Sequence, residues 1–465
     1  MAVPAAAPRE GVARRPFADP WLWGGCALYA LLFFALGVAR YTVHRNFVDL
    51  GVFSQITASA FGCFCSPLYG SQWAHHFSPI LYLAGAFMLV WHSALTLILL
   101  QAIAAALFVP AVYGLVFRHS DRKTARLAAA VTLLYPALAG MVFGDFYENA
   151  FAPAAVAWML WAFDGGYIAL TIVFGLLVLA IKEDQAFFLA AAGLLAALRY
   201  REDAPRRGAA VVLVVLSAAV ALLYLIVIQP HAQGGNPQWA ERFFSWNAST
   251  LHDLFPRGIL ERAGFIVLAF LPLLFLPFRT PAFLIAVLPL AEVLGSSSSV
   301  TYTIGQHYAG AWLGYVFYAF AIAVCAAWQK DAARVTRALY WCIGLCVAEF
   351  AVADPLHPGI NLHPYGARDA ALDRFLETLP PQADVATQEE AYTHLAASDP
   401  RATLLPETPG EPVTACFILT DQDFPDSPRL QESRGLVDRL ARSGVYRVEQ
   451  RSGKITLYRK TPGCP

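Results

Sequence analysis

Charged residues are scarce in this sequence. Only 14% of its 465 residues are Asp, Glu, Lys or Arg, and 58% are hydrophobic, whereas an average soluble globular domain has about 25% charged residues. The formal net charge is zero, so the chain lacks the excess of positive charge that binds nucleic acids. The composition therefore predicts a protein that lies mostly in a lipid bilayer.

No group of cysteines in the sequence has the spacing of a zinc finger. Cys63 and Cys65 lie in the first loop that the apolar pattern predicts, and Cys416 and Cys464 lie near the C-terminus. A disulfide between the last two is an option outside the cell, which their spacing alone does not establish. The other four cysteines fall inside apolar segments and are interpreted as packing residues: Cys26, Cys325, Cys342 and Cys346.

The N-terminal segment carries Arg9, Arg14 and Arg15, but it lacks the small-residue cleavage site of a signal peptide. The apolar run that follows, Trp21–Ala39, contains no charged residue and is long enough to cross a bilayer. We therefore interpret residues 1–20 as a cytoplasmic N-terminal tail and the apolar run as a retained first transmembrane helix.

Long apolar runs fill residues 21–353. A hydrocarbon core about 30 Å thick needs about 20 residues of helix, so we predict about eleven transmembrane helices in this domain. One shorter run, Ile80–Trp91, follows Pro79 and is interpreted as a re-entrant or interfacial helix. The predicted crossings are Trp21–Ala39, Ser93–Phe117, Leu127–Gly144, Ala150–Phe163, Tyr167–Ile181, Gln185–Leu198, Gly208–Ile228, Ala263–Phe278, Pro281–Leu294, Gln306–Trp328 and Ala338–Ala353.

The distribution of Lys and Arg supports this interpretation. If Ile80–Trp91 crossed the membrane, the basic loop with Arg118, Arg122 and Lys123 would move to the outer side. With the N-terminus in the cytoplasm and that run not crossing, the inner loops are residues 118–126, the turn at Asp164, and residues 199–207, 279 and 330–337, so that nearly all short basic loops lie inside. The outer side then receives the first loop, residues 145–148, 182–184, 231–262 and 296–307, and everything after residue 354.

The C-terminal part, residues 354–465, has more charge and shorter apolar runs. It predicts a small extracytoplasmic α/β domain of ordinary size. The elements expected there are a helix over Ala370–Leu379, a buried strand over Val413–Leu419, a helix over Leu430–Arg442 and a hairpin of Tyr446–Glu449 with Ile455–Arg459.

The first predicted outer loop, residues 40–79, contains the residues on which the functional hypothesis depends. Asp49 follows the first helix in the segment FVDLGVF, and it is either the N-cap of a helix lying along the membrane or a chemical group. His75 and His76 precede the next apolar run and, as neighbours in an extended segment, point apart. Each either contacts lipid headgroups or donates to a phosphate, and Asp49 with His76 is a candidate pair for a divalent metal ion.

Further ionisable residues lie at the predicted outer ends of later helices. Asp145, Tyr147 and Glu148 are either solvated loop residues or part of the same site. Lys182, Glu183 and Asp184 separate two short apolar segments, which suggests helices that end inside a cavity. One interpretation is an internal Lys–Glu ion pair with a purely structural role. The other is that Lys182 binds a phosphate and that one of the two carboxylates orients the lysine.

The last candidates follow a run of four serines. His307 and Tyr308 begin a predicted helix there and could close a pocket from the far side. Glu292 and Glu349 lie near helix ends and are interpreted as structural residues.

Several of these segments, in this order, resemble a bacterial family of predicted multi-spanning membrane proteins of unassigned function. That family is similar to the GT-C glycosyltransferases, whose layout of a first outer loop with an acidic residue and juxtamembrane helices matches residues 20–330. From the family motif His-Pro-Glu only Glu148 carries over, because Phe146 and Tyr147 replace the first two residues. The matching signatures are FVDLGVF with Gln55, His76-Phe77-Ser78-Pro79, Gln101, Asp145-Phe146-Tyr147-Glu148, Lys182-Glu183-Asp184 and His307-Tyr308.

The resemblance implies an inner-membrane enzyme that transfers a sugar from a polyprenyl-phosphate donor to an acceptor at the extracytoplasmic face. Asp49 would be the general base or a ligand of a divalent metal ion, and Glu148 a second catalytic acid. The implied donor-binding residues, which would neutralise or orient the departing phosphate, are His75, His76, Lys182, Glu183, Asp184, His307 and Tyr308.

Two other functions are compatible with the sequence. A transporter would place its polar residues near the middle of the membrane, whereas here they gather at one face. A scaffold or receptor would carry them scattered around the rim, each in water, and would use the C-terminal domain to bind a partner. A shared cavity holding Asp49, Lys182 and His307 would favour the enzyme.

Overall fold

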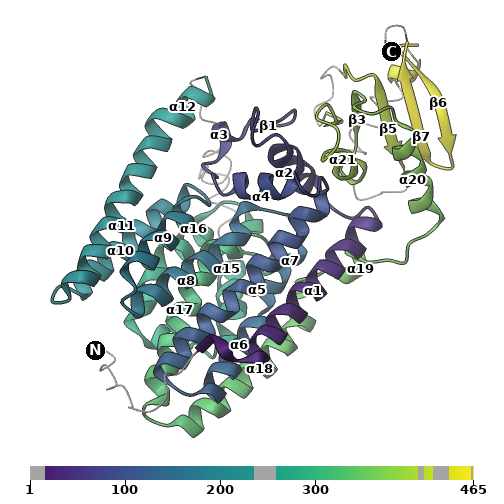
Figure 1. Ribbon diagram of the computed structural model, residues 1–465. Coiled ribbons are helices and arrows are strands. Elements are labelled where there is room, and N and C mark those ends of the chain that lie inside the picture. The colour runs from purple at the N-terminus through teal and green to yellow at the C-terminus, as the bar shows by residue number, and fades with distance from the viewer. Residues whose placement is uncertain are drawn as a thin grey trace.

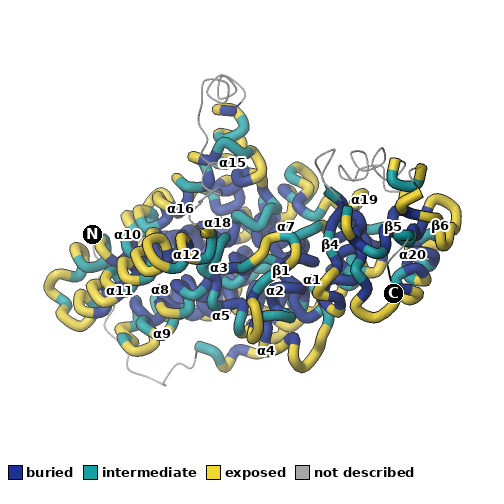
Figure 2. Tube along the Cα trace, turned by 90° about the horizontal axis from the view of Figure 1, so that it is seen from above, coloured by how far each residue is buried: buried dark blue, intermediate teal, exposed yellow. Residues whose placement is uncertain are grey.

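The computed structural model describes residues 16–234, 258–406, 413–422, 439–442, 444–461 and 464. It contains a helical bundle and, at one end of it, a small C-terminal sheet domain (Figure 1). The buried residues lie in the interior of the molecule, and the exposed residues lie around its edge (Figure 2).

Helix α17 (Ala309–Trp328) lies inside the bundle, because most of its apolar residues are buried against other helices. Some helices start at a side-chain cap: Asp19 accepts from the Trp21 amide before α1, and Asp121 from the Thr124 amide before α6. The other bundle helices are α1 (Pro20–Thr42), α5 (Ala94–His119), α6 (Arg122–Leu133), α7 (Pro136–Phe143), α8 (Ala152–Asp164), α9 (Ile168–Leu179), α10 (Asp184–Arg199), α11 (Ala204–Leu222), α12 (Gln229–Ala232), α15 (Ile259–Phe270), α16 (Leu284–Gly295) and α18 (Ala332–Ala353).

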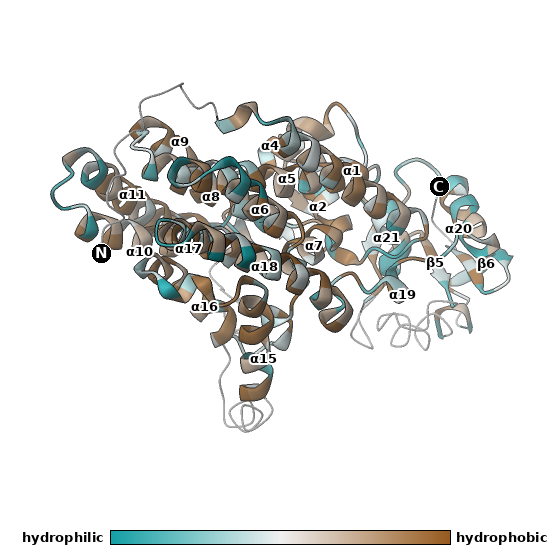
Figure 3. Ribbon diagram, turned by 90° about the horizontal axis from the view of Figure 1, so that it is seen from below, coloured by the Kyte–Doolittle hydropathy of each residue, from teal (hydrophilic) through white to brown (hydrophobic). Residues whose placement is uncertain are grey.

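The bundle helices at the periphery present apolar side chains outward, as a membrane protein does. Trp21, Leu28, Trp341 and Val352 are all more than half exposed on α1 and α18, and Figure 3 shows the hydrophobic colour concentrated on the bundle rather than on the sheet domain. Among the described residues, five helices are long and apolar enough to span a bilayer, or six if the bent pair α6–α7 is one span.

The expected count of about eleven crossings is therefore not established. Several segments counted as crossings form helices of 12 or 13 residues, such as α8, α9, α15 and α16, which are shorter than the roughly 20 residues that a perpendicular span needs. The run interpreted as re-entrant contains only α4 (Leu81–Met88), eight residues long and too short to cross.

The loop after α1 covers one end of the bundle, on the side where the sheet domain lies (Figure 1). It contains α2 (Val48–Ala58), the short pair β1 (Cys65–Ser66) and β2 (Gly70–Ser71), α3 (Gln72–His75) and α4. A disulfide joins Cys63 to Cys65 within it. The opposite end is held by ion pairs among the predicted inner loops: Arg126 with Asp19, and Arg118 and His119 with Asp164.

The C-terminal sheet domain, from α20 to β7, has five strands in the order β4-β3-β5-β7-β6. Strand β3 pairs in parallel with β4 and β5, and β7 pairs antiparallel with β5 and β6. Its elements, after the short α19 (Pro358–Asn361), are α20 (Ala367–Thr378), β3 (Val385–Thr387), α21 (Glu389–Leu395), β4 (Thr403–Leu404), β5 (Phe417–Asp421), β6 (Tyr446–Ser452) and β7 (Ile455–Lys460).

The predicted helix before β3, the strand near residue 417 and the hairpin around Gly453 are all present. Gly453 has φ +59°, the left-handed conformation that this tight turn requires. The helix predicted over Leu430–Arg442 lies mostly outside the described residues. A disulfide between Cys416 and Cys464 ties the start of β5 to the C-terminus, the option that the sequence left open.

The sheet domain rests on the first loop through α2 and α21. The Tyr392 hydroxyl of α21 donates to Gln55 Oε1 at 2.6 Å, and the Gln55 amide donates to the carbonyls of Asp399 and Ala402. A Cβ atom on Gly51 would lie 2.5 Å from the Tyr392 ring. Helix α2 therefore fits against α21 only with glycine at this position.

Candidate functional site

A cavity of about 1480 Å³ opens between the first loop, the bundle and the sheet domain. All nine residues predicted as a site line it, although they come from four separate parts of the chain. The sheet domain adds Asp384 and Glu389 to the same wall. The nine are Asp49, His75, His76, Glu148, Lys182, Glu183, Asp184, His307 and Tyr308.

Asp49 lies in the first turn of α2 and is not its N-cap. The helix begins at Val48 after Phe47, which makes no side-chain cap, so the N-cap interpretation is wrong. The Asp49 carboxylate instead accepts a hydrogen bond from the Tyr147 hydroxyl. Burial raises the pKa of Asp49 to about 7, although the Tyr147 hydrogen bond acts in the opposite direction and the nearby carboxylate of Asp145 adds to the rise.

Asp145 performs the capping that the sequence assigned to Asp49. Its carboxylate accepts from the backbone amides of Phe47 and Leu50 at 2.9 and 3.3 Å. It is buried beside the guanidinium of Arg40, at 3.3 Å. Asp145 is therefore not the solvated loop charge that was one of its two interpretations: it fixes the start of α2 and, with it, the position of Asp49.

Glu183 joins the first loop to the turn between α9 and α10. Its carboxylate lies 2.8 Å from His76 Nδ1 and accepts from the Phe77 amide at 3.0 Å. Burial would raise the pKa of Glu183, but His76 and Lys182 outweigh burial and hold that pKa below its usual range. Glu183 is thus an anion that positions the histidine at the cavity wall.

Lys182 is paired with Asp184 rather than with Glu183, because its Nζ lies 3.7 Å from Asp184 Oδ2. Burial would lower the pKa of Lys182, but the carboxylates of Asp184, Glu148, Glu183 and Glu292 outweigh it, and the net shift is upward. The lysine is therefore a fixed positive charge in the cavity wall.

Two carboxylates of the cavity have oxygens that bond to nothing in the described structure. Glu148 Oε2 and Asp184 Oδ1 are buried and have no hydrogen-bond partner. A buried acceptor without a donor costs free energy. Such oxygens fit a ligand that brings hydroxyl or ammonium donors.

Glu292 is a cavity residue that the sequence analysis interpreted as structural. It lies on α16 and lines the same cavity as Lys182 and Asp184. The available signal was a glutamate inside an otherwise apolar helix, Leu284–Gly295, which is costly in a membrane unless it faces a polar cavity.

His307 stacks on the ring of Tyr147, with centroids 3.5 Å apart and planes inclined by 14°. Burial, and then the charges of Lys182 and His76, lower the pKa of His307 well below its usual value, so it is a neutral ring. Its contact supports the tyrosine that bonds to Asp49. His75 takes a different partner from His76, the carbonyl of Tyr69 at 2.7 Å, as adjacent residues that point apart should.

The candidate metal pair Asp49 and His76 stays a prediction. Each of the two already has a partner in the protein, Tyr147 for Asp49 and Glu183 for His76. Neither belongs to a group of three metal-binding side chains anywhere in the described part of the chain. Two side chains are fewer than the three protein ligands of a catalytic zinc site.

The chain matches a protein family and, over most of its length, solved structures. A family described as "Predicted membrane protein (DUF2079)" matches residues 41–454. None of the curated proteins matches the sequence.

Solved structures resemble the chain over nearly its whole length. The crystal structure of ArnT from Cupriavidus metallidurans bound to undecaprenyl phosphate has a TM-score of 0.56 at 12% identity, over 95% of this chain and 98% of that one. ArnT in the apo state gives 0.51 at 11% identity, over 93% and 98%. ArnT has the GT-C glycosyltransferase fold, so the predicted relation to that fold is confirmed.

A weaker likeness exists to an oligosaccharyltransferase from Archaeoglobus fulgidus, in complex with Zn and sulfate. Its TM-score is 0.42 at 15% identity, over 86% of this chain and 64% of that one. That score is too low to support an inference. At these identities the likeness to ArnT describes the fold alone.

Proposed function

The chain belongs to the DUF2079 family of predicted membrane proteins, and from this premise we propose that it is a GT-C-type glycosyltransferase. It transfers a sugar from a polyprenyl-phosphate donor to an acceptor at the extracytoplasmic face. The observation that carries the proposal is the single cavity in which Asp49, Lys182 and His307 meet. A shared cavity supports an enzyme over a scaffold whose polar residues would stand separately in water.

In the proposed step, the oxygen of an acceptor hydroxyl forms a bond to the anomeric carbon of the sugar. The bond from that carbon to the phosphate oxygen breaks, and its electron pair leaves with polyprenyl phosphate. Asp49 takes the hydroxyl proton. A base whose pKa lies near 7 suits this role, because it is partly deprotonated at neutral pH and still basic enough to accept a proton.

The departing phosphate needs positive charge where its own negative charge develops. Lys182 is held protonated by its carboxylate neighbours, and His75 and His76 line the same cavity. The unpartnered oxygens of Glu148 and Asp184 would accept hydrogen bonds from hydroxyl groups of the sugar. ArnT, the structural neighbour, was crystallised with undecaprenyl phosphate, and a lipid phosphate of this class is the donor carrier we propose here.

The proposed topology places the N-terminus (residues 1–20) in the cytoplasm, about eleven crossings over residues 21–353 in the inner membrane, and residues 354–465 outside. Two observations support it. The predicted inner loops meet at one end of the bundle through Arg118, Asp164 and Arg206, while the cavity lies among the predicted outer segments. Both disulfides lie on the cavity side, and disulfides persist in oxidising compartments.

The proposal is tested with the purified full chain in detergent or proteoliposomes. Polyprenyl-phosphate sugars are offered together with a panel of lipid, sugar and peptide hydroxyl acceptors, and release of polyprenyl phosphate is measured, because every transfer releases this product whichever acceptor takes the sugar. Asp49→Asn should lower the turnover by about 10²–10⁴-fold, the usual contribution of a positioned base.

Glu377→Gln is the matched control, since Glu377 is an exposed carboxylate of α20 outside the cavity. It should retain the turnover of the unmodified protein. Full activity of Asp49→Asn would remove Asp49 from the mechanism. No turnover of any polyprenyl-phosphate sugar by the unmodified protein would refute the transferase itself.

A further inference from the structure

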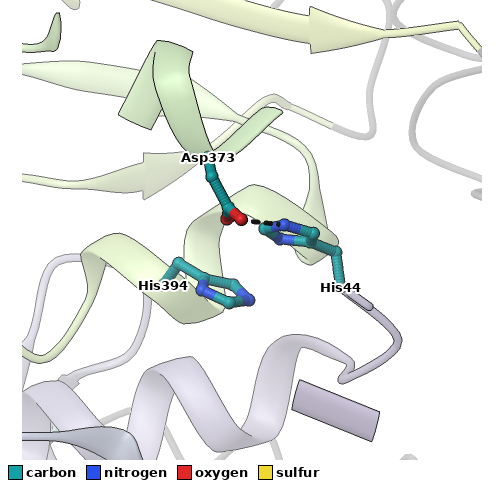
Figure 4. Close-up of side chains that lie close together, drawn as sticks. All are labelled: His44, Asp373 and His394. Atoms are coloured by element: carbon teal, nitrogen blue, oxygen red, sulfur yellow. Dashed lines mark ion pairs between the residues drawn. The ribbon is translucent and has the colours of Figure 1, made fainter. Parts of the chain in front are cut away.

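A second cluster of ionisable side chains lies outside the cavity, at the junction of α1 and the sheet domain. It consists of His44, which follows α1, Asp373 of α20 and His394 of α21 (Figure 4). Each offers one nitrogen or oxygen atom, and these atoms lie within 4.8 Å of one another. It is the one group of three metal-binding side chains in the described parts of the chain.

His44 is completely inaccessible to solvent. Neither ring nitrogen has a well-aligned side-chain hydrogen bond, and the partners near the ring are Asp373 and a backbone group of Asp369. Nε2 lies 3.0 Å from Asp373 Oδ1, a close contact that lacks hydrogen-bond alignment. Its φ of +55° is in the left-handed region that non-glycine residues seldom adopt, so the backbone is held in a costly conformation that points this ring into the cluster.

His394 is already oriented by the protein. Its Nε2 lies 3.0 Å from the backbone carbonyl oxygen of Tyr41, which can only accept a hydrogen bond. The neutral ring therefore carries its proton on Nε2 and its lone pair on Nδ1. In histidines that bind metals, a hydrogen bond of this kind, from the N–H of the other ring nitrogen to a backbone carbonyl, fixes the tautomer.

We propose that His44, Asp373 and His394 bind one divalent transition-metal ion, of which Zn²⁺ is the best fit, and that this ion fastens the sheet domain to the end of α1. Two imidazoles and one carboxylate are a ligand set that zinc accepts, with water completing a tetrahedron. Asp373 is 37% exposed, so the fourth position opens to solvent.

The geometry requires a small closure around the ion. Ligands about 2.1 Å from a tetrahedral zinc lie about 3.4 Å apart, whereas the three atoms are within 4.8 Å. Asp373 Oδ1 already lies 3.0 Å from His44 Nε2, so the closure concerns the distances from His394 to the other two side chains. The neighbouring cation Arg368 acts on His44 and opposes a bound cation, and its ion pair with Asp421 at 2.8 Å offsets part of that charge.

The role of the ion would be structural. None of the three ligands lines the cavity, and the segment between His44 and Asp49 leads directly into α2. The metal would join the stretch before Asp49 to two helices of the sheet domain, beside the contact of Gln55 with Tyr392. The site is independent of the proposed transferase activity, and its test does not use that activity.

The test uses the full purified chain, stripped with a chelator, dialysed against Zn²⁺ and then against metal-free buffer. Metal content is measured by mass spectrometry. The unmodified protein should retain one zinc per chain, and its melting temperature should rise by a few degrees with zinc, as a ligand bound only to the folded state requires. Co²⁺ in place of zinc should give the visible absorption of a tetrahedral site.

Three variants locate the ion. Asp373→Asn, at a half-exposed position that should not disturb folding, and His394→Gln should both lose the zinc and the thermal response. His357→Gln, an exposed histidine outside the cluster, is the matched control and should keep both.

Zinc retained by Asp373→Asn and His394→Gln would overturn the proposal, as would an unmodified protein that holds no more zinc than either variant. Loss of the zinc in Asp49→Asn or His76→Gln, with retention in Asp373→Asn, would place the ion in the cavity instead and would also overturn it.

Discussion

Burial and one hydroxyl group act in opposite directions on the protonation of Asp49. The Tyr147 side chain donates to the Asp49 carboxylate and favours its charged form, while burial favours the neutral form. Stacking of Tyr147 on His307 holds that hydroxyl in place. The pH at which the proposed base becomes active should therefore depend on Tyr147.

Tyr147→Phe removes the hydrogen bond and keeps the aromatic ring. The bond lowers the pKa of Asp49, so its loss should raise that pKa above the value of about 7. The base works deprotonated, and the acid limb of kcat/KM against pH should shift to higher pH. At a pH well above both pKa values, most of the activity should return.

The measurement is donor turnover from about pH 5.5 to 9, where a general base with a pKa near 7 is titrated. Tyr340→Phe, which removes an exposed hydroxyl on α18, should leave the profile unchanged. An acid limb that stays in place or moves to lower pH in Tyr147→Phe would mean that Asp49 is not the titrating base.

The sequence was informative about which residues matter and less so about what each one touches. Ionisable groups in apolar surroundings are expensive, and this criterion found Asp49, Glu148 and Lys182, all of which line the cavity. It did not identify Tyr147 as the partner of Asp49, because the two are 98 residues apart and only the fold brings them together. Glu292 was undervalued for the same reason.

At the scale of elements, α2 is positioned by residues outside it. Asp145 accepts from two amides at its N-terminus and pairs with Arg40 of α1, and Gln55 near its C-terminus bonds to the sheet domain. The helix that carries Asp49 is therefore fixed at both ends by polar contacts.

Asp145→Asn should destabilise the protein strongly. The substitution keeps the shape but leaves the buried Arg40 guanidinium without its counter-ion, since both side chains are at most 4% exposed. Loss of one partner of a buried ion pair costs about 3–5 kcal/mol. The melting temperature in detergent measures this.

The control is Glu449→Gln, which breaks a surface ion pair with Arg459 in the sheet domain. Such pairs contribute about 0–1 kcal/mol, so this melting temperature should hardly change. If Asp145→Asn were as stable as the control, the Arg40 pair would not be what holds the start of α2.

Elements with strong local signals could be predicted, and those set by distant partners could not. The charge-free run that begins at Trp21 predicted α1, and the turn at Gly453 predicted the β6–β7 hairpin. The start of α2 was misinterpreted, because an aspartate in its first turn has the sequence pattern of a cap, while the true acceptor, Asp145, follows α7.

At the scale of the whole molecule, the cavity exists because three parts of the chain meet. The first loop and the bundle supply the nine predicted residues, and the sheet domain supplies Asp384 and Glu389. The sequence placed the polar residues at one face of a helical domain, which is enough to predict a common site. It contains no local signal for the wall that the sheet domain adds, since that wall depends on how α21 docks on α2.

The cellular compartment that the cavity faces can be determined by counting the free thiols of the protein. Of the eight cysteines, four are paired, Cys63 with Cys65 and Cys416 with Cys464, and the other four are buried thiols in the bundle. If the cavity face lies outside the cytoplasm, both bridges form in the cell because that compartment is oxidising. Protein denatured at lysis in the presence of a thiol-blocking reagent, so that the buried thiols react, and then weighed should carry four labels, and eight when it is reduced before labelling.

Cys416→Ser should raise the count without reduction from four to five, since it frees Cys464, whereas Cys346→Ser should lower it from four to three, since Cys346 is a free thiol. These opposite changes separate a genuine bridge from incomplete labelling. Eight labels without reduction would mean that the cavity and the sheet domain face a reducing compartment. The donor would then have to be presented on the cytoplasmic leaflet, and the proposed orientation would be inverted.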